Sequence, residues 1–154
     1  MLARDIMDTQ FHTLKPSDTV SHAVRRFQGA SREEKKNIYG LMVTDENEHL
    51  VGMLSMYDIM LFIQPKHVRI WGEMDDLDPG ELFDELLERV KKIQVGDIMS
   101  TNVVTVGANT HLMVIADTMI KKHVRRIPVI ENGEVVGIVY RSNVFYHLLQ
   151  RVLN

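Results

Sequence analysis

The chain has 154 residues, of which 45% are hydrophobic, and it carries a formal net charge of -3 without a single cysteine. This length fits one domain or two small fused ones, and the acidic balance argues against a protein that binds nucleic acid through backbone phosphates. The lack of cysteine excludes disulfides, thiolate nucleophiles and cysteine-based zinc sites. Because the first residues lack the apolar core of a signal peptide and no apolar run approaches the roughly 20 residues of a membrane helix, we expect a cytoplasmic protein with no membrane partner.

The chain contains an internal duplication. Asp5-Ile6-Met7 returns 92 positions later as Asp97-Ile98-Met99, and the same offset pairs Thr13 with Thr105. The offset falls to 86 further along, because the first copy carries six extra residues near positions 29–36. The interface between the halves of such a repeat is a place where pockets for small ligands form.

In chain order, the first copy is predicted to form a strand, a helix, two strands and a second helix. Apolar residues at Val20, Ala23, Val24 and Phe27 give the first helix one buried face. The charged stretch Gly29 to Asn37 is interpreted as a solvated surface loop. The predicted strands cover Phe11 to Leu14, Ile38 to Thr44 and Leu50 to Ser55, and the second helix runs from Asp58 to Ile63.

An amphipathic helix is predicted between the copies. Asp78-Pro79-Gly80-Glu81 supplies an N-cap, a proline at the first helical position and a carboxylate at the third, and apolar residues from Leu82 to Val90 follow. We expect this helix to pack against the rest of the chain or against a second subunit.

The second copy repeats the order of the first. Asn132-Gly133 tolerates the positive φ angles of a two-residue hairpin, so the strands around it are predicted to be antiparallel. The predicted elements are strands over Val103 to Val106, Ile127 to Ile130 and Val135 to Tyr140, a helix with its apolar face from Leu112 to Met119, and a helix over Ser142 to Val152. We therefore expect an α+β fold of two pseudo-symmetric β-α-β-β-α repeats, over residues 1–64 and 96–154, with a linker over 65–95.

The local sequence that is most specific is Gly52-Met53-Leu54-Ser55-Met56-Tyr57-Asp58, at a strand-to-helix junction. The carboxylate of Asp58 can accept hydrogen bonds from two neighbouring ribose hydroxyls, while Ser55, Tyr57 and the amides of the helix start can meet a phosphate or another polar ligand edge. A simpler interpretation is a capping box, in which Ser55 and Asp58 stabilise the helix by about 1 kcal/mol without any ligand.

The equivalent junction of the second copy differs. Tyr140, Ser142 and the neutral Asn143 stand there, and a hydrogen bond from a hydroxyl to Asn143 lacks the assistance of a charge, so a second site is expected to be weaker or to select another ligand.

Basic residues gather shortly before this junction. In Lys121-Lys122-His123-Val124-Arg125-Arg126 the two lysines suit a helix end, whereas Arg125 and Arg126 directly precede a buried strand and are better candidates for a phosphate contact. The first copy has Tyr39-Gly40 at this place, without charge.

Nothing in the sequence supports catalysis or a metal site. The seven histidines are scattered, with no His-Glu-x-x-His pattern. A phosphate-binding glycine loop with lysine and a Gly-x-Ser-x-Gly elbow are absent as well. We predict a protein that is not an enzyme and holds no metal.

The order of these motifs resembles the CBS domain, and the whole chain resembles a tandem CBS pair, or Bateman module. The resemblance rests on the two Asp-Ile-Met segments, Thr13 and Thr105, Arg126-Ile127-Pro128-Val129 and the segment ending in Asp58. It implies two repeats packed through their sheets, with clefts for AMP, ADP, ATP or S-adenosylmethionine, and usually a homodimer.

The resemblance also implies roles for individual residues. Asp58 would hold the ribose hydroxyls, Ser55 and Tyr57 would lie near ribose or phosphate, and Arg125 and Arg126 of the other half would reach phosphates. Adenine would lie against apolar strand residues and backbone in two windows. The predicted contacts there are Phe11, His12 and Thr13, then Val103, Val104 and Thr105, with Met53 on the strand before Asp58; Tyr39, Gly40, Tyr140, Ser142 and Asn143 form the weaker second site.

Two functions compete. The first is a sensor module in which a bound adenosyl ligand shifts the arrangement of the halves, and an unidentified protein partner reads the change. The second is a structural or interaction module with ligand-free clefts, in which Ser55 and Asp58 serve only as caps. The sensor is favoured because a phosphate explains Arg125 and Arg126, which have no evident capping role.

Overall fold

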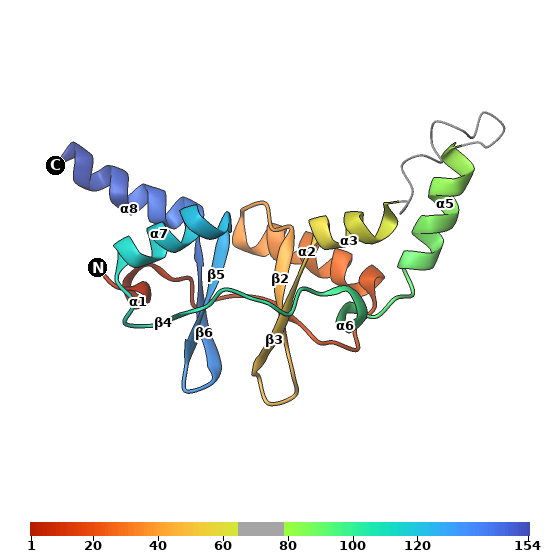
Figure 1. Ribbon diagram of the computed structural model, residues 1–154, viewed down its shortest axis with the longest axis horizontal. Helices are drawn as coiled ribbons and strands as arrows, with labels where there is room; N and C mark the ends of the chain where they lie inside the picture. The colour runs from red at the N-terminus through yellow and green to blue at the C-terminus, as the bar shows by residue number, and fades with distance from the viewer. Residues whose placement is uncertain (65–78) are drawn as a thin grey trace. The chain divides into compact units, whose positions relative to one another are not determined.

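The computed structural model of the chain describes residues 1–64 and 79–154 and divides them between two units (Figure 1). The first-repeat unit holds residues 12–45 and 51–101, and the second-repeat unit holds residues 1–11, 46–50 and 102–154. Each unit is built around one three-stranded sheet, in the order β1-β2-β3 or β4-β5-β6. The α+β fold predicted from the sequence is confirmed.

In the first-repeat unit, strand β1 pairs in parallel with β2, so that Thr13 lies opposite Met42. A parallel pair needs a crossover connection, and helix α2 supplies it. The elements are β1 (Thr13–Leu14), α2 (Val20–Glu34), β2 (Gly40–Thr44), β3 (Leu50–Ser55), α3 (Met56–Ile63), α5 (Pro79–Val90) and α6 (Val95–Ile98). The predicted linker helix is therefore present as α5; its predicted N-cap, Asp78, lies outside the described residues.

The second-repeat unit repeats this plan. Its elements are α1 (Ala3–Ile6), β4 (Val106–Gly107), α7 (Leu112–Lys122), β5 (Arg126–Glu131), β6 (Glu134–Tyr140) and α8 (Arg141–Leu153). Strands β5 and β6 are antiparallel, with Glu131 opposite Glu134. Asn132 and Gly133 between them have φ angles of 53° and 81°, which confirms the predicted two-residue hairpin.

Each unit has its own apolar core. In the first-repeat unit, Val20, Ala23, Phe27 and Ala30 turn one face of α2 onto the sheet, and Val90 at the end of α5 joins the same cluster. In the second-repeat unit, Ile115 and Met119 of α7 pack with Val129 and Val139 of the sheet. The helix faces predicted from the apolar spacing are thus the faces that are buried.

The two repeats exchange their opening segments. Helix α1, which starts the first copy in sequence, packs in the second-repeat unit, where Asp8 forms a bridge with Ile138 of β6. Helix α6, which starts the second copy, packs in the first-repeat unit, where Ser100 forms a bridge with Met53 of β3. The predicted boundaries at 64 and 95 describe the sequence repeat. The two structural units divide the chain differently, so these boundaries stay a prediction.

The loop predicted over Gly29 to Asn37 is wrong for most of its length, because α2 continues to Glu34. The helical spacing of apolar residues is hard to recognise among so many charged ones. Ala30 lies on the buried face one turn after Phe27 and is 1% exposed. Ser31 then fixes the end of the helix, since its hydroxyl accepts a hydrogen bond from the backbone N of Ile38 at 2.9 Å.

Three predicted strands are too long. The first contains only Thr13 and Leu14, the next begins at Gly40 because the backbone N of Ile38 binds Ser31, and the strand predicted over Val103 to Val106 keeps only Val106. The short helices α1 and α6 were not predicted. They coincide with the repeated Asp-Ile-Met segments and last only four residues, too few to show a helical period.

Within the described residues, no helix combines the length and apolar character that crossing a membrane requires.

Candidate functional site

The junction of β3 and α3 forms a complete capping box. Ser55 is the N-cap of α3, and its hydroxyl accepts a hydrogen bond from the backbone N of Asp58 at 3.2 Å. In return, Oδ2 of Asp58 accepts a hydrogen bond from the backbone N of Ser55 at 2.8 Å and one from the Ser55 hydroxyl at 3.0 Å. The interpretation of these two residues as a cap is therefore correct as local structure.

The second oxygen of Asp58 binds the segment that follows α6. Oδ1 accepts a hydrogen bond from the hydroxyl of Ser100 at 3.0 Å. Ser100 is held in place by two backbone hydrogen bonds to Met53, at 2.9 and 2.8 Å. The sequence reasoning missed Ser100. No local pattern marks it, since its contact with Asp58 joins residues 42 positions apart.

The carboxylate of Asp58 keeps capacity for a ligand. An ionised carboxylate offers about four acceptor positions, and three hydrogen bonds to Asp58 are described above. Asp58 is half-buried and lines a cavity of about 750 Å³ beside α3, α5 and α6. The other residues that line this cavity are Leu61, Phe62, Ile63, Leu86, Arg89, Lys92, Ile93, Asp97 and Ile98. A ligand hydroxyl can therefore bind Oδ1 beside Ser100 or in its place.

Other predicted site residues of the first-repeat unit lie around this junction or at β1. Tyr57 is 68% exposed in the first turn of α3. The backbone carbonyl of Thr13 accepts a hydrogen bond from Arg26 at 3.2 Å. The ring of His12 lies between two carboxylates, with Nε2 2.6 Å from Glu33 and Nδ1 3.1 Å from Glu34. Across the described residues, no group of histidines and acidic residues is arranged to hold a metal ion.

The basic candidates belong to the second-repeat unit. Arg125 is exposed, and its backbone carbonyl accepts a hydrogen bond from the backbone N of Arg141 at 2.8 Å. Arg126 is half-buried at the start of β5, opposite Tyr140 of β6. The predicted adenine contacts Phe11, Val103, Val104 and Thr105 are assigned to the same unit. Since Asp58 belongs to the other unit, a cleft shared by Asp58 and the arginines stays a prediction.

The predicted second site is also divided between the units. Tyr39 and Gly40 lie in the first-repeat unit, and Tyr140, Ser142 and Asn143 lie in the second-repeat unit. The side-chain amide of Asn143 donates hydrogen bonds to the backbone carbonyl of Ile6 at 3.1 Å and to Oδ1 of Asp8 at 3.3 Å. Asn143 therefore has a structural task as a donor.

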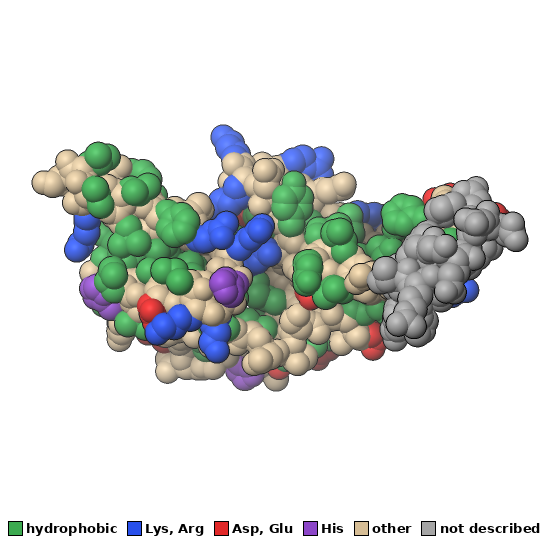
Figure 2. All heavy atoms as spheres, turned by 45° about the horizontal axis from the view of Figure 1, so that its top comes forward, with side chains coloured by type: hydrophobic (Ala, Val, Ile, Leu, Met, Phe, Trp, Pro, Cys, Tyr) green, Lys and Arg blue, Asp and Glu red, His purple; other side chains and the backbone are tan. Residues whose placement is uncertain are grey.

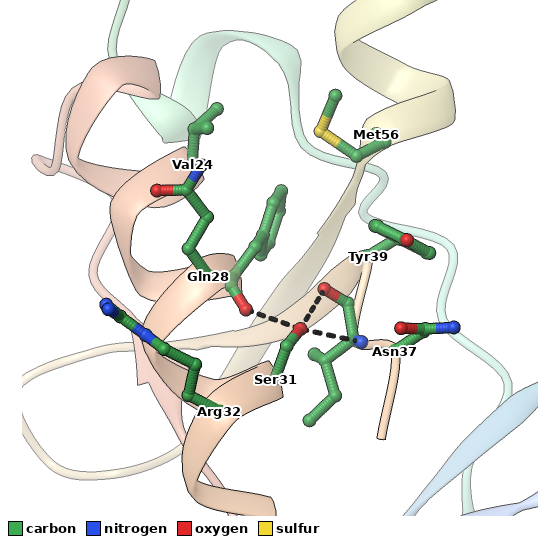
Figure 3. Close-up of a pocket in the computed structure, with 9 residues that line it drawn as sticks. Val24, Gln28, Ser31, Arg32, Asn37, Tyr39 and Met56 are labelled. Atoms are coloured by element: carbon green, nitrogen blue, oxygen red, sulfur yellow. Dashed lines mark hydrogen bonds between the residues drawn. The ribbon is translucent and has the colours of Figure 1, made fainter. Parts of the chain in front are cut away.

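A second cavity, of about 710 Å³, lies beside the last turns of α2 (Figure 3). Val24, Gln28 and Arg32 extend from α2 on one side of it, and Tyr39 and Met56 face them from the other (Figure 3). The remaining lining residues are Phe27, Ser31, Asn37 and Ile38. Sequence reasoning named Tyr39 but did not predict a cavity here, because three of its nine lining residues, Ser31, Arg32 and Asn37, fall in the stretch interpreted as a loop.

Curated relatives match most of the chain. A chloroplastic CBS domain-containing protein from Arabidopsis thaliana, CBSX2, is 31% identical over 146 residues, which is 90% of this chain and 59% of the relative. Hypoxic response protein 1 from Mycobacterium tuberculosis is 24% identical over 98% of this chain and 87% of its own length. The chain spans about three fifths of the length of the Arabidopsis relatives CBSX2 and CBSX1.

Solved structures of the same kind share the fold. CBSX2 from Arabidopsis thaliana matches with a TM-score of 0.73 at 28% identity, over 99% of this chain and 97% of that one. CBSX2 in complex with AMP matches with a TM-score of 0.69 at 28% identity, over 98% of both chains. The family model of the CBS domain matches residues 3–65 and again residues 95–150. These two matches lie on the two copies of the internal repeat, and the chain belongs to the CBS domain family.

Proposed function

We propose that the chain is a non-catalytic regulatory module that binds an adenine nucleotide in a cleft between its two repeats. The observation that carries this proposal is the carboxylate of Asp58, which is fixed at a helix start and keeps acceptor capacity. A relative with 28% sequence identity binds AMP, which supports the choice of ligand class.

In this proposal Asp58 binds the ribose hydroxyls, and the exposed Arg125 together with Arg126 binds the phosphate. Ser55 and Tyr57 lie near the ribose or the phosphate, and adenine packs on the apolar segments that contain Phe11 or Val103 and Val104. ADP, ATP and S-adenosylmethionine share the adenosyl group and belong to the same ligand class. A second cleft near Asn143 is weaker, because an amide lacks the charge of a carboxylate.

Dimerisation is part of the proposal. The second-repeat unit exposes apolar side chains along α7 and α8 (Figure 2). They include Met113, Val114, Ile120, Phe145, Leu149, Val152 and Leu153, each at least 49% exposed. A second copy of the chain that covers this surface removes it from water. A change in the cleft then reaches a protein partner through the arrangement of the repeats.

One observation favours the alternative function. The hydrogen bonds of Asp58 to Ser55 and Ser100 account for its position without any ligand. A structural or interaction module with ligand-free clefts would keep the same junction.

Calorimetric titration separates the two functions. The wild-type protein is titrated with AMP, ADP, ATP and S-adenosylmethionine, and so are Asp58→Asn and the control Ser100→Ala. We expect Asp58→Asn to weaken AMP binding about tenfold or more, since the hydrogen bonds from ribose lose their charge assistance. Ser100→Ala leaves the carboxylate in place and is expected to bind AMP within about threefold of the wild type.

A further variant tests the phosphate contact. Arg125→Ala is expected to weaken AMP binding while leaving adenosine binding unchanged. If a folded wild-type protein, checked by its thermal unfolding, binds none of the four ligands, the sensor proposal fails and the interaction module remains.

A further inference from the structure

The cavity beside the end of α2 is lined in part by residues that only the first repeat has. Helix α7 ends at Lys122, which the offset of 92 pairs with Ala30, whereas α2 continues to Glu34. Ser31 and Arg32 therefore belong to the six residues that the first copy has in excess. They extend the wall that Val24, Phe27 and Gln28 of α2 begin.

Hydrogen bonds hold the walls of this cavity together. The Ser31 hydroxyl lies 2.7 Å from the carbonyl of Phe27 and accepts from the backbone N of Ile38 at 2.9 Å, which ties α2 to the segment before β2 (Figure 3). The backbone N of Met56 donates to the carbonyl of Tyr39 at 2.8 Å, which ties that segment to α3. Walls that are fixed by such hydrogen bonds lower the entropic cost of binding a ligand.

The charge at the cavity is positive. Glu33 and Glu34, the two acids of the extra turn, both contact His12. Neither of them lines the cavity, and its described lining contains no acidic residue. Arg32 lines it, and no carboxylate among residues 1–64 and 79–154 pairs with the Arg32 guanidinium. Glu33 and Glu34 thus pair with His12, and Arg32 is the charged residue of the described cavity lining.

We propose that this cavity binds a small organic anion, in which an apolar body lies on Phe27, Ile38 and Met56 and a carboxylate binds Arg32. The volume of about 710 Å³ falls within the range of small-molecule pockets. Phe27 and Ile38 are 3% and 1% exposed and form an apolar floor. The planar guanidinium of Arg32 matches a carboxylate with two parallel hydrogen bonds. The described lining offers no carboxylate for ribose hydroxyls, so this site differs from the one at Asp58, although it shares Tyr39 with the predicted second cleft.

Octanoate is the probe for this proposal, because it joins a carboxylate to an unbranched apolar chain. Titration is followed by the backbone amide NMR signals of the whole chain. We expect the largest shifts at Ser31, Ile38 and Tyr39, and we expect Arg32→Ala to weaken binding about tenfold. Arg32→Lys keeps the charge and is expected to recover part of that loss. Arg25→Ala is the matched control, since Arg25 is an exposed arginine of the same helix outside the cavity lining.

Several results would overturn the proposal. Octylamine that shifts the same signals as strongly as octanoate would show that the charge plays no part. AMP that displaces octanoate would make the cavity part of the nucleotide site, since Tyr39 is shared with the predicted second cleft. If octanoate binds nowhere near α2 and Gln28→Trp changes the mass of the particle in sedimentation, the cavity is a contact between copies of the chain. A protein that binds octanoate but no nucleotide upholds this proposal and rejects the proposed function.

Discussion

The two strand-to-helix junctions of the repeats each form a hydrogen bond with the segment that follows the repeated Asp-Ile-Met motif, but the helix residue accepts in one repeat and donates in the other. In the first-repeat unit, Asp58 accepts a hydrogen bond from Ser100. In the second-repeat unit, Asn143 donates one to Asp8. Asp58 pairs with Asn143 at an offset of 85, because the first copy has one more residue in its later turn, and Ser100 pairs with Asp8 at the offset of 92. Each junction therefore contains one carboxylate, on the helix in one repeat and on the returning segment in the other.

The contact with Asp8 explains why a neutral amide stands at position 143, without any ligand. An aspartate at position 143 would face both the carboxylate of Asp8 and the backbone carbonyl of Ile6, all of them acceptors. The amide supplies the donor that both acceptors need. The neutral Asn143 therefore complements the carboxylate of Asp8. Titration decides separately whether the second cleft binds a ligand.

The largest effect is expected where the two junctions agree. At both, a glycine lies against the methionine of the repeated motif, and a Cβ added at Gly52 would lie 2.6 Å from Sδ of Met99 and 2.8 Å from the carbonyl O of Ser100. The methionine can move, but the backbone carbonyl is held in a bridge. We expect Gly52→Ala to reduce the free energy of unfolding by about 2 kcal/mol, measured by urea denaturation.

Gly29→Ala is the matched control for this change. Gly29 lies inside α2, and a Cβ there meets nothing within 4 Å, so alanine is expected to stabilise the protein by about 0.5–1 kcal/mol. Equal effects at the two glycines would contradict the packing argument.

An intermediate effect is expected where the junctions differ. Asn143→Asp places a second carboxylate against Asp8 and is expected to lower the free energy of unfolding by about 1–2 kcal/mol at neutral pH. The additional change Asp8→Ser copies the chemistry of the first junction and is expected to restore most of the loss. If the double variant is no more stable than Asn143→Asp, repulsion between carboxylates at positions 8 and 143 is not the cause of the loss.

The smallest effect is expected from a single hydrogen bond. Ser100→Ala removes one donor from Asp58, which keeps its two contacts with Ser55. Because Ser100 is exposed and water can replace its hydroxyl, we expect a loss of about 0.5–1 kcal/mol in thermal unfolding. The exposed neighbour Thr101→Ala serves as the reference. A loss above about 2 kcal/mol would mean that Ser100 contributes more than this hydrogen bond.

The sequence predicted those parts of the fold that repeat over several turns or pleats. The faces of α2 and α7, the hairpin at Asn132-Gly133 and the helix α5 all follow from local patterns that extend over enough residues to be recognised. The extra turn of α2 was missed because Arg32, Glu33 and Glu34 outnumber the one apolar residue, Ala30, that continues its buried face.

The site was predictable only in its local part. The contact of Ser55 with Asp58 spans three residues and could be inferred from spacing. The hydrogen bonds of Ser100 to Asp58 and of Asn143 to Asp8 join residues 42 and 135 positions apart. No local sequence pattern predicts such contacts. The cavity beside α2 depends on Ser31 binding Ile38, which requires the helix end to be known first.

The exchange of opening segments has a consequence for biosynthesis. Residues 12–101 contain everything that the first-repeat unit needs apart from a turn, so this unit can form while the chain is still being made on the ribosome. Residues 1–11 are translated before strand β6 and helix α8, with which they pack. Because the contact of Asp8 with Asn143 joins residues 135 positions apart, we expect residues 1–11 to dock only after the residues up to α8 have been made.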